Sequence, residues 1–380
     1  MAATDRFDYL DGIRAVAIAA VLALHWFSWY VPLFHGGSVG VDVFFVLSGF
    51  IITTVLWRTP LALEGSGGPG TWLRGWASFL RRRVLRLYPA LAGLVVGCVL
   101  LYAVVPSAPD GPAEVARRGL LALTQTSSVW AAGQHGSLWL PGIEPFGHTW
   151  SLAVEWYFYL LWPLVVLVAR ARGWSAVLLM RVSLAVAAAA YLLSLPLGTF
   201  VFYFGPSARS AELLAGAALA LRFAGHGRPE TPSRHGNLVA VTALVAVTAY
   251  AVLGRDGHDL LYRIVGIPVA VLGTVALIHT GYAGSTGPVQ RLLAHPWIAA
   301  VGRHSYSLYL WHIVPFLLLE DAELPKPVLG LIAVTSAVAL TVLSYRLLEK
   351  PFLRPRSDVL RPRRTGEVSP SPARPASPAR

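Results

Sequence analysis

Charged residues are scarce in this chain of 380 residues, in which Asp, Glu, Lys and Arg together make up 13%. A soluble domain of this length carries about a quarter charged residues. Hydrophobic residues instead reach 55%, the mean hydropathy is +0.58, and several apolar runs approach the ~20 residues that a bilayer-spanning helix needs. The composition excludes a soluble globular protein and predicts an all-α, polytopic bundle in the membrane.

Cysteine is nearly absent, since Cys98 is the only one in the sequence. A single cysteine excludes an intrachain disulfide and a cysteine-based metal cluster. The histidines of interest lie on different predicted spans and lack the spacing of metal ligands, so we expect no metal.

Acidic residues are also few, with 19 Asp and Glu against 31 Lys and Arg. Arginines gather between or beyond the apolar runs, at 74–86, 170–172, 222–234 and after 350, which is typical of the positive-inside rule. Nucleic-acid binding would need a basic face with groove-reading or aromatic elements, so we expect no nucleic-acid partner. We expect a multi-pass protein of the cytoplasmic membrane, surrounded by lipid, with both termini in the cytoplasm.

The apolar runs predict about ten transmembrane helices, at residues 10–32, 39–57, 87–106, 148–169, 175–198, 210–223, 236–253, 259–281, 304–320 and 327–348. The connection over 107–147 contains an apolar piece at 120–130 that is too short to span, and it predicts a re-entrant or interfacial segment. Residues 1–353 form one predicted transmembrane domain. The Pro-, Ser- and Arg-rich tail over 354–380 is expected to be disordered and cytoplasmic.

Ionisable side chains inside apolar spans are the main functional signal, because each costs at least ~2.5–3.5 kcal/mol in lipid. The first span contains Asp11, Arg14 and His25. Asp11 and Arg14 are three residues apart, which predicts an ion pair. Arg14 and His25 point the same way, about 16 Å apart along the helix. His25 is a candidate for proton transfer, and a neutral core histidine is the alternative.

The fourth predicted span contributes His148, Trp150 and Glu155. His148 and Glu155 are seven residues apart and lie near one helical face, while Trp150 suits the membrane interface. A carboxylate at Glu155 would orient His25 and stabilise its imidazolium, or would make a structural ion pair instead.

Arg83 and Arg86 share a helical face just before the third predicted span. They are suited to the phosphates of a donor, but such clusters usually serve anionic lipids and topology, and spacing alone favours that alternative.

Four further polar residues lie within or beside the spans. His312 is expected to line the same cavity as His25, and Glu349 to anchor a helix end at the surface. Asp42 and Ser48 lie in the second predicted span, and Asp42 is placed near the outer boundary, where solvation makes a structural charge tolerable.

Six motifs in register resemble acyltransferase family 3, the membrane-bound O-acyltransferases of bacterial surface polysaccharides and some macrolides. The match runs from about residue 7 to 353 and rests on Asp11-Gly-Ile-Arg14 with His25, Gly40-Val-Asp-Val-Phe-Phe-Val-Leu-Ser-Gly-Phe50, Arg83-x-x-Arg86-x-x-Pro89, Trp150-Ser-Leu-x-Val-Glu155, Ser305-Tyr-Ser-Leu-Tyr-Leu-Trp-His312 and Tyr345-Arg-Leu-Leu-Glu-Lys-Pro351.

The resemblance implies transfer of an acyl group, acetyl by default, from cytoplasmic acyl-CoA as co-substrate to a hydroxyl of a sugar or glycosylated small molecule. It matches Arg14 and His25 to the family's essential pair, and Arg83 and Arg86 to its donor-side motif. Family members commonly have Glu-Glu-Gln-Phe-Tyr where this chain has Glu155-Trp-Tyr-Phe-Tyr, so any role of the second acid and the amide is absent.

The chemical role of His25 has two versions, a base for the acceptor hydroxyl or a transient carrier of the acyl group. Two other classes of protein are also compatible with buried His, Arg and Glu. A secondary transporter would show repeat symmetry or paired broken helices, which the sequence lacks. A non-catalytic membrane scaffold would tolerate the loss of His25.

Overall fold

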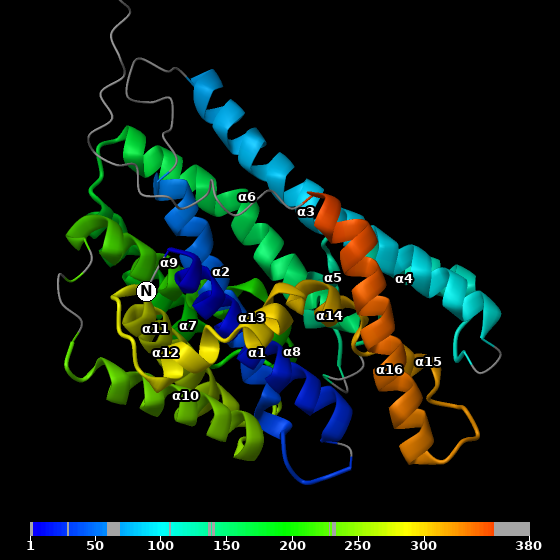
Figure 1. Ribbon diagram of the computed structural model, residues 1–380. Helices are drawn as coiled ribbons and strands as arrows, with labels where there is room; N and C mark the ends of the chain where they lie inside the picture. Colours follow the sequence, from blue (N-terminus) through cyan, green and yellow to red (C-terminus); the bar gives the residue numbers. More distant parts are fainter. Residues whose placement is uncertain are drawn as a thin grey trace, which may run out of the picture.

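The computed structural model of the protein describes residues 3–28, 30–58, 69–105, 108–135, 138, 141–227, 229 and 233–352. The described residues form a helical bundle (Figure 1), which confirms the predicted all-α membrane fold. The predicted disordered tail at 354–380 lies outside these residues.

Eight helical segments among the described residues are long and apolar enough to cross a membrane. They contain the helices α1 (Ala3–Phe27), α2 (Val39–Arg58), α3 (Pro69–Val104), α6 (Trp150–Ala171), α7 (Ala176–Ser194), α10 (Gly236–Leu253), α11 (Ile267–Tyr282) and α16 (Lys326–Ser344).

Shorter elements connect these helices or extend their ends. They are η1 (His35–Ser38), α4 (Pro112–Leu123), α5 (Ser127–Ala132), η2 (Gly147–Thr149), α8 (Thr199–Phe204), α9 (Pro206–His226), η3 (Tyr262–Gly266), α12 (Pro288–Leu293), α13 (Pro296–Arg303), α14 (Ser305–Trp311), α15 (Val314–Leu318), η4 (Tyr345–Glu349) and η5 (Lys350–Phe352).

Two of the ten predicted spans differ in the structure. The span predicted at 210–223 is the middle of α9, whose 21 residues include Arg209, Glu212 and Arg222. Because of these three charged residues, α9 is not among the eight helical segments that are apolar enough to cross a membrane. The span predicted at 304–320 is interrupted between α14 and α15. Pro315 explains the interruption, because its ring clashes with the carbonyl four residues earlier, at Trp311, where α14 ends.

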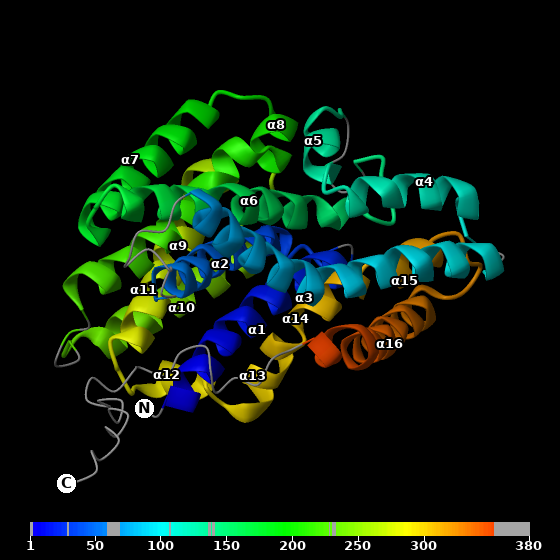
Figure 2. The same ribbon diagram turned by 90° about the horizontal axis from the view of Figure 1, so that it is seen from above.

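The connection over 107–147 contains two short helices rather than one apolar segment. The amphipathic α4 buries Val115, Gly119 and Ala122 and lies against the end of α3, as Figure 2 shows. The predicted apolar piece at 120–130 covers the end of α4, a turn and the start of α5.

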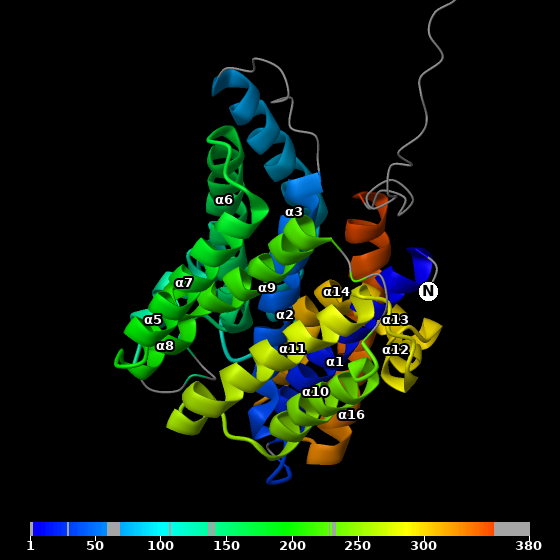
Figure 3. The same cartoon turned by 90° about the vertical axis from the view of Figure 1, so that its left-hand side faces the viewer.

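Helix α9 packs at the centre of one half of the bundle, against α2 and α7 and beside α11 (Figure 3). Its contact with α2 is unusually close, because a Cβ added at Gly216 would lie 2.0 Å from the Val46 carbonyl oxygen. Gly49 meets the Leu213 carbonyl oxygen in the same way, at 1.9 Å. Small residues permit such backbone contact between membrane helices.

We expect Gly216→Ala to lower the thermal stability of the purified protein in detergent. The added methyl group meets backbone, and overpacking of this kind costs about 1–3 kcal/mol. Gly330→Ala in α16 is the matched control, because its Cβ would meet no atom within 4 Å and Ala is favoured over Gly in a helix by about 1 kcal/mol. Equal melting temperatures for the two variants would contradict the close packing.

Candidate active site

One pocket gathers four arginines, and we name it the arginine pocket. Its charged lining consists of Arg14, Arg83, Arg86 and Arg303 with the carboxyl groups of Glu155 and Glu349. Ser48 also lines this pocket. Six of the site residues predicted from the sequence therefore lie here, namely Arg14, Ser48, Arg83, Arg86, Glu155 and Glu349. Four guanidinium groups and two carboxyl groups line the pocket itself, and two further carboxylates pair with Arg14 and Arg303 from beside it. The geometry of a guanidinium group suits phosphate.

The guanidinium groups of this pocket are held by their neighbours. Arg14 pairs with Asp11 at 3.6 Å, which confirms the predicted ion pair, and Arg303 pairs with Asp8 at 3.2 Å. Arg83 lies 5.2 Å from the ring centres of both Phe79 and Tyr159.

Glu349 does not anchor a helix end at the surface as expected from sequence. Its side chain is buried and accepts a hydrogen bond from Ser307, because η4 continues α16 into the bundle and turns this residue toward the pocket.

A second pocket is lined by His25 and His148, and we name it the histidine pocket. Trp150, Tyr203 and Ser38 contribute further parts of its wall. His148 and Glu155 therefore line different pockets although both belong to the α6 region, because seven helical residues separate them by about 10 Å.

His25 is in contact with a second imidazole, that of His312. The Nδ1 atom of His25 lies 2.9 Å from the Val21 carbonyl oxygen and 3.3 Å from Nε2 of His312. The Nδ1 atom of His312 lies 2.7 Å from the Tyr309 carbonyl oxygen. Both Nδ1 atoms are thus assigned as N–H donors to carbonyls, so the lone pair of each neutral ring is on Nε2.

The helix interruption after α14 places His312. Its backbone carbonyl accepts a hydrogen bond from Nε1 of Trp26 at 2.9 Å, which ties the interruption to α1. The His312 side chain is fully buried behind His25. The two imidazoles are in contact, but His312 does not line the histidine pocket with His25, as the sequence had led us to expect.

Tyr309 and Val41 line both pockets and form the wall between them. The hydroxyl of Tyr309 donates to the His148 carbonyl oxygen at 2.8 Å and lies 2.7 Å from Oγ of Ser151. Its ring stacks on His312, with centroids 5.5 Å apart. Tyr309 was not singled out from the sequence, although it lies three residues before His312 in the same motif.

Asp42 is not solvated near a boundary, as expected from sequence, but fully buried with Arg209 and Glu212. Nη1 of Arg209 lies 2.8 Å from Asp42 and 2.9 Å from Glu212. The hydroxyl of Tyr262 donates to Asp42 at 2.9 Å. This network joins α2, α9 and η3. Asp42 is buried rather than solvated because α9 covers the start of α2.

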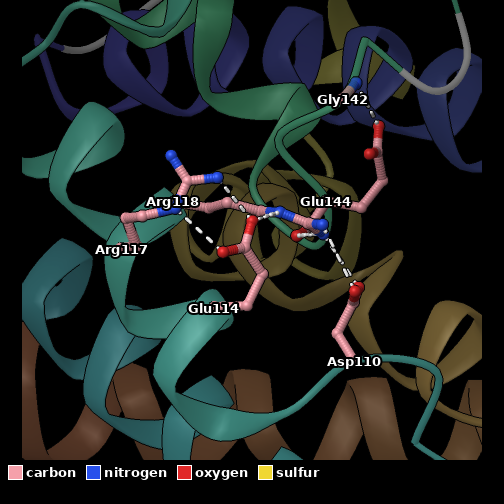
Figure 4. Close-up of polar contacts among 6 residues, drawn as sticks. All are labelled: Asp110, Glu114, Arg117, Arg118, Gly142 and Glu144. Atoms are coloured by element: carbon pink, nitrogen blue, oxygen red, sulfur yellow. Dashed lines mark hydrogen bonds and ion pairs between the residues drawn. The ribbon is translucent and has the colours of Figure 1, made fainter.

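Arg118 fixes the turn that leads into η2 and His148 (Figure 4). It donates to Asp110 at 2.8 Å, to Glu114 at 2.8 Å and to the Glu144 carbonyl oxygen at 3.0 Å. Hydrogen bonds from Arg117 above all, and from Arg118, lower the pKa of Glu114 from its usual 4.5 to about 2. The carboxylate therefore keeps its charge, and its hydrogen bonds to Arg117 and Arg118, in acid that would protonate an ordinary glutamate.

The fold and the two pockets define a polytopic membrane protein with a two-part polar site enclosed by helices. The chain belongs to acyltransferase family 3, whose acyltransferase domain matches residues 7–346. Among the described residues, no group of three or more His, Cys, Asp or Glu side chains is arranged to hold a metal ion.

Three curated relatives illustrate the family. The chain is 28% identical over 368 residues to the peptidoglycan O-acetyltransferase OatA of Listeria monocytogenes, covering 90% of this chain and 55% of that protein. It is 29% identical over 363 residues to the O-acetyltransferase OatA of Staphylococcus aureus, covering 90% and 56%. It is 30% identical over 368 residues to the putative peptidoglycan O-acetyltransferase YrhL of Bacillus subtilis, covering 90% and 54%.

The chain thus spans about half the length of the curated relatives it matches. No solved structure has significant similarity to it.

We expect Arg209→Met to destabilise the protein by about 3–5 kcal/mol, because it leaves two buried carboxyl groups without their cation. Thermal unfolding in detergent measures the effect. Adding Asp42→Asn and Glu212→Gln to the same variant is expected to restore part of the loss.

Arg255→Met is the control, since Arg255 is 69% exposed beside Asp259, and exposed pairs contribute about 0–1 kcal/mol. A melting temperature of Arg209→Met equal to that of the control would contradict a stabilising role for the network.

Proposed function

We propose that the protein transfers an acyl group, acetyl by default, from cytoplasmic acyl-CoA to a hydroxyl of a sugar or glycosylated small molecule. The arginine pocket takes the donor and the histidine pocket takes the acceptor. The observation that supports this most strongly is the shared wall of Tyr309 and Val41, which brings a cationic pocket and an imidazole pocket into contact.

Binding of the donor follows from charge and shape. Coenzyme A carries phosphates at one end and an uncharged pantetheine arm at the other. The guanidinium groups of Arg83 and Arg86 suit the phosphates, and Phe44, Phe45 and Ile52 supply apolar wall for the arm. The first half of α3 contains the basic residues from Arg74 to Arg86, and the positive-inside rule predicts that this end of α3 lies on the cytoplasmic side.

Family membership supports an acyltransferase. The names of the relatives indicate which acyl group and which acceptor to test first. Two of them are named as O-acetyltransferases of peptidoglycan. Acetyl-CoA and an amino-sugar saccharide are therefore the first substrates to test.

The reaction can proceed by direct transfer with His25 as the base. Nε2 of His25 removes the proton from the acceptor hydroxyl, and the oxygen attacks the thioester carbonyl carbon. The carbon–sulfur bond then breaks, and the proton on His25 passes to the departing thiolate. In the alternative, Nε2 attacks the thioester carbonyl carbon and the carbon–sulfur bond breaks, which releases the thiolate. The acceptor hydroxyl then takes the acyl group from Nε2, and its proton passes to the thiolate.

His312 lies beside His25 in the supporting position for which the sequence offered Glu155 as one candidate. Nδ1 of His25 donates its hydrogen to the Val21 carbonyl oxygen and lies 3.3 Å from Nε2 of His312, so the lone pair of His312 stabilises the charge when His25 becomes an imidazolium. Glu155 lines the arginine pocket instead, where it balances the charge of Arg14 and Arg83.

We expect His25→Gln to lower the rate of acetyl transfer by about 10²–10⁴-fold, the usual contribution of a general acid–base group. His312→Gln should cost about tenfold, the value of one hydrogen bond of ~1.4 kcal/mol. The measurement is transfer from labelled acetyl-CoA to N-acetylglucosamine oligosaccharides by the purified chain in nanodiscs.

His304→Gln is the matched control, because Nδ1 of His304 also bonds the carbonyl four residues earlier, at 2.7 Å from Ala300. It should retain the rate of the unaltered protein. Full activity of His25→Gln, or sugar movement across liposome membranes without release of CoA, would refute the proposed chemistry.

We expect Arg83→Gln and Arg86→Gln each to raise KM for acetyl-CoA by about 10- to 100-fold, since a hydrogen bond to a charged group contributes about 1.5–3 kcal/mol. KM for S-acetylpantetheine, which lacks phosphates, should stay unchanged in both variants. Steady-state kinetics with the two donors measures the difference.

Arg81→Gln is the control on the same helix, because Arg81 is exposed and outside the lining of the pocket. If the KM for acetyl-CoA of all three variants changes equally, and only with the fraction of anionic lipid in the nanodisc, the arginines bind the bilayer rather than the donor.

A further inference from the structure

Three polar atoms at the wall of the histidine pocket are buried without a hydrogen-bond partner among the described residues. They are Oγ of Ser38 and both ring nitrogens of His148, in side chains that are 2% and 7% exposed. The carbonyls of Pro145 and Leu310 lie near the His148 ring but outside hydrogen-bonding geometry. A buried polar group left unsatisfied costs about 1–3 kcal/mol.

These unsatisfied atoms have no role in the proposed transfer step, which uses His25 and His312. The neighbouring Ser151, by contrast, is paired with Tyr309 at 2.7 Å. Native structures contain few unsatisfied buried groups, so two adjacent to one pocket indicate a polar ligand there.

The aromatic part of the same pocket is rigid. Trp150 and Tyr203 both line it, with ring centroids 5.2 Å apart. Arg209 lies over both rings, 5.4 Å from the centre of Trp150 and 4.8 Å from that of Tyr203. The ion network of Arg209 with Asp42 and Glu212 therefore fixes the aromatic wall as well as the helices.

A further part of the lining is polar and comes from the loop after α10. Asp256 and His258 line the pocket there, 3.5 Å apart. The backbone N–H of Leu138 donates to Nε2 of His258 at 3.4 Å, which joins this loop to the connection before η2.

We propose that the histidine pocket is a saccharide subsite in which Ser38 and His148 bind ring hydroxyls other than the one that is acylated. A pyranose ring has an apolar face for Trp150 and Tyr203 and hydroxyls around its edge for the unsatisfied atoms. Apolar walls with a few placed polar groups are how such pockets fix orientation. This inference rests on the proposed function and names the residues that select the acceptor.

Ser38→Ala separates a ligand-binding role from a structural one. Removal of an unsatisfied hydroxyl should leave the melting temperature of the ligand-free protein unchanged or higher, because a buried cost disappears. The same change should raise KM for N-acetylglucosamine oligosaccharides about tenfold through one lost hydrogen bond. His148→Phe keeps a ring but lacks both nitrogens, and it should behave in the same way.

Ser183→Ala is the matched control. Ser183 is also 2% exposed, but its hydroxyl donates to the Leu179 carbonyl oxygen at 2.7 Å, and it is outside the lining of the histidine pocket. Its acceptor KM should equal that of the unaltered protein.

A deoxy analogue of the sugar supplies a double-mutant cycle. An analogue that lacks the hydroxyl bound by Ser38 should show the same KM with Ser38→Ala as with the unaltered protein. The inference is overturned if Ser38→Ala and His148→Phe lower the melting temperature while the acceptor KM stays constant. That result would leave acetyl transfer intact, whereas absence of transfer by the unaltered protein would refute the proposed function itself.

Discussion

The contact between the imidazoles of His25 and His312 depends on a helix that stops in the middle of the bundle. Pro315 prevents α14 from continuing past Trp311, and the His312 carbonyl bonds Trp26 of α1 instead of a following turn. Just before the interruption, the ring of His312 lies beside His25 and the ring of Tyr309 lies between the two pockets. The carbonyl that the interruption frees therefore holds this end of α14 against α1, next to His25 in the chain.

Buried charge is handled in two different ways in this bundle. Around Asp42, Arg209 and Glu212 the charges pair with one another and with Tyr262, and no solvent reaches them. In the arginine pocket, Arg14 and Arg303 pair with Asp11 and Asp8, while Arg83 and Arg86 line a cavity beside Glu155 and Glu349. A closed network stabilises helix packing, whereas guanidinium groups on the wall of a cavity are able to bind an anion. The structure therefore distinguishes two kinds of arginine where the sequence gives only their positions.

Much of the fold could be predicted from the sequence because apolar length alone identifies membrane helices. Arg14 and Glu155 could be identified because each stands out in an apolar run, whereas Arg83 and Arg86 lie in a basic cluster and were matched to a site only through the resemblance. Periodicity gives the face of one helix but not its neighbour, so the sequence offered Glu155 as a partner of His25, although the structure places His312 in contact with it. The burial of Asp42 under α9 and the wall formed by Tyr309 likewise depend on contacts across more than 150 residues, which no local pattern encodes.

The wall between the pockets also limits what has to move during the proposed reaction. If the thioester enters from the arginine pocket and the alcohol from the histidine pocket, only the acyl carbonyl has to pass Tyr309 and Val41. Tyr309 is held at its hydroxyl by the His148 carbonyl and at its ring by His312, so the wall resists opening for a large group. Because the nucleotide stays on one side and the saccharide on the other, the protein needs no path that carries a whole substrate across the membrane. A short acyl group therefore suits this geometry better than a long one.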